Sequence, residues 1–143
     1  MILVEQTAKT IAYGRVDRCV VFVCRGGAIN DVEWAAYCTY LAKSLQPGRW
    51  CALVVGDGLP SASQRQALRA HTSHLMAGAR IAVVSDSIKT RGAVTALSWF
   101  DSGYRSFARS RMLDALDYLQ ITDVVMSSSV RDLAHALGEQ VHR

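Results

Sequence analysis

Hydroxyl, carboxylate and basic side chains gather in two short stretches, and each stretch follows a run of apolar residues. The first is 56–63, and its candidate binding residues are Asp57, Gly58, Ser61 and Ser63. The second is 85–91, and its candidates are Asp86, Ser87, Lys89, Thr90 and Arg91. Serine and threonine cap the free amide groups of a helix start, and the same amides attract an anion. Two interpretations stay open: helix caps, or a site for a phosphate or a partner.

Motifs of known enzyme classes do not occur in the sequence. It has no G-x-S-x-G nucleophile motif, no glycine-rich phosphate loop and no H-E-x-x-H zinc motif. His71 and His74 lie three residues apart on an expected helix, but the residues around them offer only alcohols and amides as further ligands. We therefore expect no catalytic residue, no metal and no cofactor.

The composition is that of an ordinary globular domain. The 143 residues suit one domain over 1–143, and half of them are hydrophobic. The formal net charge is +4, but the basic residues are scattered along the chain, so we expect no nucleic-acid partner. The four cysteines lie in apolar runs. The first residues lack the features of a signal peptide. No apolar stretch is long enough to span a membrane. These features predict a cytoplasmic protein.

Apolar runs alternate with amphipathic stretches along the chain. Strands are expected at 2–13, 19–25, 50–55, 80–85 and 104–108, with 121–126 as a further short extended segment. Helices are expected at 31–45, 64–76, 90–100, 111–119 and 130–141. This alternation predicts a single-domain α/β fold, in which a mixed, mostly parallel sheet of four or five strands begins with a hairpin and is covered by four or five helices. Ligands of such sheets bind beyond the carboxyl ends of the strands, where the two polar stretches lie.

The expected helix at 31–45 carries two faces of interest. Trp34, Cys38 and Leu41 belong to one apolar stripe, and Tyr37 and Tyr40 are assigned to another face. For these two tyrosines, packing within the domain and contact with a second subunit, as in a homodimer, both stay open.

Several stretches together resemble the SpoIIAA-like branch of the STAS domains, which are folds of the anti-sigma-factor-antagonist type. The matching residues are Asp57 ahead of a helix, 80–86 (RIAVVSD), Trp99 with Phe100, Phe107, and 115–119 (ALDYL). The resemblance covers about residues 3–120 and implies a STAS-like fold. It leaves the C-terminal segment 127–142 as an appended helix.

The resemblance implies a non-catalytic regulatory module of bacterial signalling that binds another protein, either a kinase or a second copy of itself. In such antagonists the partner kinase phosphorylates a serine at the helix start after the central strand, and the matching candidates are Ser61 and Ser63. The chain departs from the family because Gly58 stands where the family has a serine after the aspartate. The branch is also similar to the CRAL-TRIO lipid-transfer fold. The alternative function is therefore a small-molecule or lipid carrier with an apolar pocket between helices and sheet.

Overall fold

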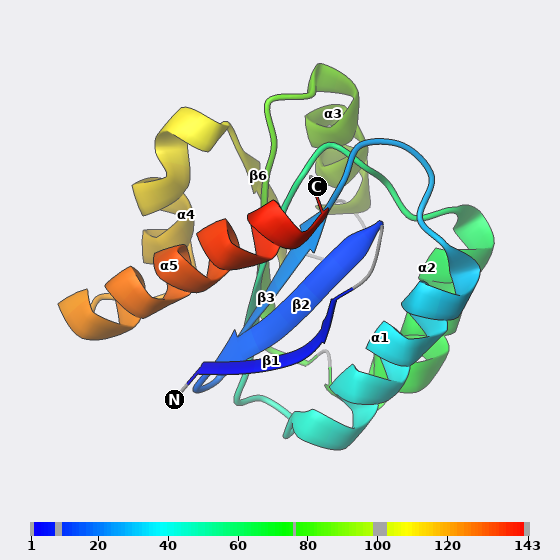
Figure 1. Ribbon diagram of the computed structural model, residues 1–143, viewed down its shortest axis with the longest axis horizontal. Coiled ribbons are helices and arrows are strands. Elements are labelled where there is room, and N and C mark those ends of the chain that lie inside the picture. Colours follow the sequence, from blue (N-terminus) through cyan, green and yellow to red (C-terminus); the bar gives the residue numbers. More distant parts are fainter. Residues whose placement is uncertain (1, 8–9, 76, 99–102, 142–143) are drawn as a thin grey trace.

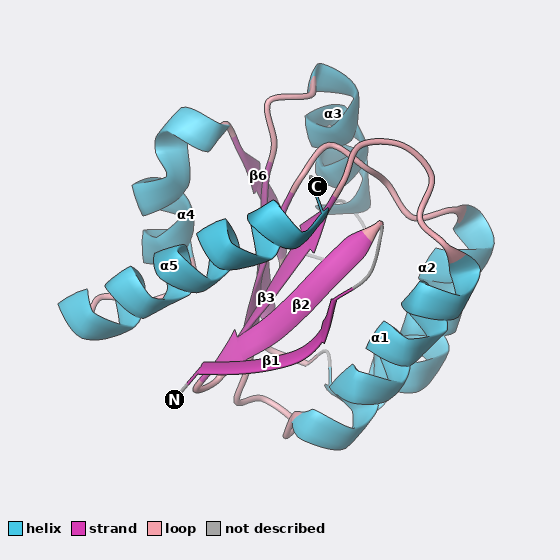
Figure 2. Ribbon diagram, viewed as in Figure 1, coloured by secondary structure: helices cyan, strands magenta, loops and turns pink. Residues whose placement is uncertain are grey.

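A computed structural model describes residues 2–7, 10–75, 77–98 and 103–141 of the protein (Figures 1 and 2). Its strands are β1 (Ile2–Thr7), β2 (Ile11–Val16), β3 (Cys19–Cys24), β4 (Cys51–Val55), β5 (Arg80–Val84) and β6 (Tyr104–Phe107). Its α-helices are α1 (Asp31–Ser44), α2 (Ala62–Thr72), α3 (Ile88–Ser98), α4 (Met112–Tyr118) and α5 (Val124–Val141). Two short 3-10 helices, η1 (Ser73–Leu75) and η2 (Arg109–Arg111), extend α2 and precede α4.

The strands form one mixed sheet whose spatial order is the chain order, β1-β2-β3-β4-β5-β6. The first two pairings are antiparallel, and β3–β4, β4–β5 and β5–β6 are parallel. Every residue of β3 is buried, as expected for a central strand that helices cover on both faces. The predicted α/β class, with its mostly parallel sheet and N-terminal hairpin, is confirmed.

Helices cover both faces of the sheet (Figure 1). The helices that connect parallel strands, α1, α2 and α3, lie on one face, as successive crossovers in one direction require. On the other face α5 runs across β2 and β3, and α4 lies against β5 and β6. Within the described part of the chain, no helix combines the length and apolar character needed to cross a membrane.

The N-terminal stretch 2–13 was expected as one strand, but it contains β1 and the first half of β2. The sheet therefore has six strands among the described residues, where four or five were expected. The expected strands at 2–13 and 19–25 leave a turn to the residues between them, but Gly14 lies inside β2 opposite Val21. The turn is confined to residues 17 and 18, and Asp17 has a left-handed φ of 49°, a conformation that aspartate tolerates better than most residues.

The segment 121–126 was expected to be extended, but its second half is the first turn of α5. The reason is Asp123, whose carboxylate accepts a hydrogen bond from the amide of Met126 at 3.2 Å and so caps the helix. The helix thus begins at Val124, before residue 130 where the expected helix starts. Its buried residues, which include Val130, Leu133 and Leu137, pack directly against the sheet.

Candidate functional site

The loop that follows β4 is fixed by two glycines against the end of β3. Gly56 has a φ of 142°, and a Cβ there would lie 2.2 Å from the carbonyl oxygen of Cys24. At Gly58 a Cβ would lie 2.9 Å from the carbonyl oxygen of Arg25. Both distances are below any van der Waals contact, so the two strand-end loops fit closely only because these residues have no side chain.

Asp57, between the two glycines, is held from β5 and α3. The hydroxyl of Ser85 donates to the Asp57 carboxylate at 2.5 Å, and the hydroxyl of Thr90 donates to the Asp57 backbone carbonyl at 3.0 Å. Ser85 and Thr90 are both buried. These two hydroxyls fix the position of Asp57, which is itself exposed.

A second carboxylate, Asp86, lies at the same edge and shares a cation with Asp57. The backbone amide of Arg109 donates to Asp86 at 3.0 Å, and the Arg109 guanidinium lies 3.9 Å from a carboxylate oxygen of each aspartate. All three side chains are between 44% and 63% exposed, so each ion pair contributes at most about 1 kcal/mol to stability. The array is therefore a fixed pattern of accessible charge. We call Asp57, Asp86 and Arg109 the charged edge.

Arg109 was missed by the sequence analysis. Its signal is its place just beyond the carboxyl end of β6, and this edge also holds the ends of β4 and β5. The expected binding residues came only from the loops after the strands at 50–55 and 80–85, although the same rule applies to every parallel strand.

The remaining candidates after β5 form the start of α3. Ser87 accepts a hydrogen bond from the amide of Thr90 at 3.2 Å, which is a helix cap. Lys89 is exposed and Arg91 is partly buried on the first turns of α3. The hydroxyls here already have partners, and two carboxylates stand next to the helix start. A partner group that donates hydrogen bonds or carries positive charge therefore suits this surface better than a simple anion does.

The two serines after β4 lie at the start of α2. Ser61 accepts a hydrogen bond from the amide of Gln64 at 3.1 Å, and the Gln64 side chain accepts one from the amide of Ser61 at 2.9 Å, forming a capping box. The hydroxyls of Ser61 and Ser63 are 3.1 Å apart, and both residues are exposed. Ser61 is therefore a helix cap by geometry, and both hydroxyls face solvent.

The two tyrosines of α1 differ in their surroundings. Tyr37 is 5% exposed, and its ring lies 4.6 Å from that of Phe22 and 5.0 Å from that of Tyr13. Tyr37 was assigned to a different face from Trp34 and Cys38, but α1 buries a stripe wide enough to include all three, so Tyr37 packs within the domain. Tyr40 is partly exposed and packs on Tyr13 at 5.1 Å.

A buried thiol lies next to the loop that follows β4. Burial raises the pKa of the Cys24 thiol, which lies 3.8 Å from the carbonyl oxygen of Gly58. Among the described residues, no group of three or more His, Cys, Asp or Glu side chains is placed to hold a metal ion. One pocket has a volume of about 730 Å³, lies at the opposite edge of the sheet and is lined largely by polar and charged residues. It is unlike the apolar pocket expected of a lipid carrier.

Comparisons with known proteins support the fold. No protein-family model matches the sequence, and no curated protein matches it significantly. A solved structure of an uncharacterised protein of the DUF3478 family from Shewanella loihica PV-4, described as having a SpoIIAA-like fold, is similar to this chain with a TM-score of 0.54 and 19% identity. The match covers 80% of this chain and 98% of that one. The protein therefore has a SpoIIAA-like fold.

Proposed function

We propose that the protein is a non-catalytic, STAS-like regulatory module of the cytoplasm that binds another protein through the carboxyl edge of its parallel strands. The observation that carries this proposal is the charged edge, which consists of two exposed aspartates and one arginine. Asp57 is held by the buried hydroxyls of Ser85 and Thr90, and Asp86 accepts a hydrogen bond from the backbone amide of Arg109. A fixed charge pattern serves recognition, because a partner meets it without ordering it first.

Exposed apolar side chains also occur at the starts of helices that follow the parallel strands. Ile88, the first residue of α3, is 81% exposed, and Val32, in the first turn of α1, is 79% exposed. Both residues follow loops that leave the carboxyl ends of parallel strands. A mixture of apolar anchors and a polar rim is the usual composition of a protein–protein interface, and it supports a protein as the partner.

Two classes of partner suit this proposal, a kinase or a second copy of the chain. Ser61 and Ser63 are the proposed phosphorylation sites, since both hydroxyls are exposed at the start of α2. A phosphate there adds about two negative charges beside a helix start and so alters what the edge can bind. Tyr40 stays a candidate for a contact between subunits.

Affinity capture from cells that naturally make the protein tests this proposal. Ile88→Arg alters the proposed edge, and Val124→Arg is its matched control, because Val124 is also the first residue of a helix and is 79% exposed. We expect the wild type and Val124→Arg to retain the same partner, and Ile88→Arg to lose it by about tenfold or more. A double Ser61→Asp, Ser63→Asp variant should also change the retained set. Equal retention by all four proteins would contradict the proposal.

A further inference from the structure

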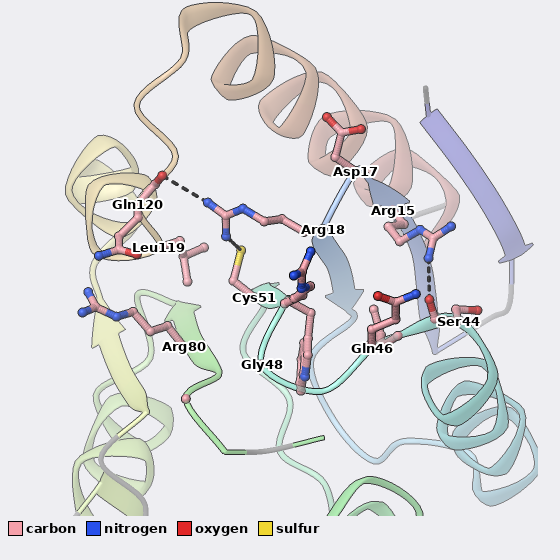
Figure 3. Close-up of a pocket in the computed structure, with 14 residues that line it drawn as sticks. Arg15, Asp17, Arg18, Ser44, Gln46, Gly48, Cys51, Arg80, Leu119 and Gln120 are labelled. Carbon is pink, nitrogen blue, oxygen red and sulfur yellow. Dashed lines mark hydrogen bonds between the residues drawn. The ribbon is translucent and has the colours of Figure 1, made fainter. Parts of the chain in front are cut away.

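A concave surface lies at the edge of the sheet opposite the charged edge (Figure 3). It is a pocket of about 730 Å³ formed where the β2–β3 turn, the α1–β4 loop, the start of β5 and the end of α4 meet. Its size falls in the range of about 300–1,000 Å³ that is usual for small-molecule sites. We call it the arginine pocket, because Arg15, Arg18, Arg49 and Arg80 all line it.

These arginines come from three separate parts of the chain, namely the β2–β3 hairpin, the α1–β4 loop and the start of β5, and three of the four are anchored by neutral groups. Arg15 donates to the carbonyl of Ser44 at 2.6 Å, and Arg18 donates to the carbonyl of Gln120 at 3.2 Å (Figure 3). The other contacts are Arg18 to the Cys51 sulfur at 3.4 Å, Arg80 to the Tyr118 carbonyl at 2.9 Å, and Arg80 over the Tyr118 ring at 5.2 Å. The anchors hold the guanidinium groups in place and leave their charges intact.

Within the part of the chain that the structure describes, none of the four guanidinium groups has a carboxylate within 4.0 Å. The lining contains a single acidic residue, Asp17, whose carboxylate points away from the labelled arginines in Figure 3. The side chain of Arg49 makes no hydrogen bond or ion pair with any described residue. The pocket thus concentrates uncompensated positive charge around a hollow.

The Cys51 thiol, which also lines the pocket, experiences the same positive charge. Its pKa is lowered first by the hydrogen bond from Cys19 and then by the charge of Arg18, against the opposing effect of burial. A nearby guanidinium that stabilises a thiolate stabilises other anions as well.

We propose that the arginine pocket binds a small anion with several negative charges, of the phosphate-ester class. Each guanidinium has five N–H donors and uses at most two of them within the protein, so a fork of donors remains for a phosphate. Three net positive charges around one hollow match a ligand with several charges better than a single carboxylate. The pocket is separate from the charged edge, so this proposal stands or falls independently of the proposed function.

Isothermal titration calorimetry with inorganic pyrophosphate and with ATP tests the proposal. Arg49→Gln removes the charge that has no internal partner, so the variant should fold as the wild type does. Arg69→Gln is the matched control, because Arg69 is an exposed residue of α2 outside the pocket. We expect saturable binding by the wild type, about tenfold weaker binding by Arg49→Gln, and less than about twofold change in Arg69→Gln.

Three results would overturn it. The first is no saturable binding of either probe to the wild type. The second is equal weakening in both variants, which would show a general effect of net charge. The third is tight binding of a single-stranded oligonucleotide through Arg49 when neither pyrophosphate nor ATP binds, which would make the pocket part of a nucleic-acid surface.

Discussion

At the scale of single residues, Gly58 is the position at which the loop after β4 departs from the STAS pattern that the sequence resembles. The resemblance places a serine at this position, but here a Cβ would lie 2.9 Å from the backbone oxygen of Arg25 and 3.2 Å from that of Gly27. Backbone atoms move aside less easily than the end of a flexible side chain. A serine side chain at position 58 would therefore disturb the close packing of the two loops. The next exposed serines along the chain are Ser61 and Ser63.

The fit of Gly58 makes a direct prediction. Gly58→Ala should lower the free energy of unfolding by about 1–3 kcal/mol, because the new methyl group must displace backbone. Gly26→Ala is the control, since a Cβ there has open space within 4 Å. Its effect should stay within about 0.5 kcal/mol in the same urea titration. If the two variants are equally stable, the loops are not packed as described.

The sequence predicted the candidates after β4 and β5 but not how they are connected. Serine and threonine after an apolar run are strong signals for caps, and Ser61 and Ser87 do cap helices. The bond from Ser85 to Asp57 and the position of Arg109 depend on which loops become neighbours, which no local pattern encodes. The same holds for the arginine pocket, whose arginines are scattered in sequence and meet only in the folded chain.

At the scale of elements, α5 is part of the core although the family resemblance ends before it. Its buried residues pack on β2 and β3. They belong to the same apolar cluster as the buried residues of α4, which lies against β5 and β6. The apolar spacing of 130–141 predicted an amphipathic helix, but only the fold identifies the surface that this helix covers. The residues of β3, β4 and β5 were easier to predict, because a strand buried on both faces is apolar throughout.

The packing of α5 can be tested with one pair of leucines. Leu137 is fully buried, so Leu137→Ala should cost about 2–5 kcal/mol of unfolding free energy. Leu113 on α4 is 64% exposed, and Leu113→Ala should cost less than about 1 kcal/mol in the same measurement. Similar losses in both variants would mean that α5 is not docked on the sheet.

At the scale of the whole molecule, buried thiol and phenol groups with raised pKa values make the stability of the fold sensitive to high pH. Burial raises the pKa of Cys38 to about 11 and raises that of Tyr37 well above its ordinary value. A group whose pKa is higher in the folded state than in the unfolded state stabilises the fold fully at any pH below the unfolded pKa, which is near 9 for a thiol. This stabilisation is lost as the pH rises through the folded pKa.

The free energy of unfolding should therefore fall by about 2 kcal/mol or more between about pH 8 and about pH 10.5, with Cys38 as one contributor. Urea titrations at the two pH values measure this change. In Cys38→Ala the absolute stability should be lower, but the loss between the two pH values should be smaller than in the wild type. A loss that is unchanged in Cys38→Ala would exclude this thiol as a source.

Site-specific photo-crosslinking in living cells can show whether the carboxyl edge of the parallel strands binds a partner protein. A photoreactive amino acid replaces Lys89, which is exposed beside the charged edge, or Glu139, which is exposed on α5. The account predicts a discrete cross-linked protein from position 89 and none from position 139. No product from position 89, or the same product from both positions, would contradict it.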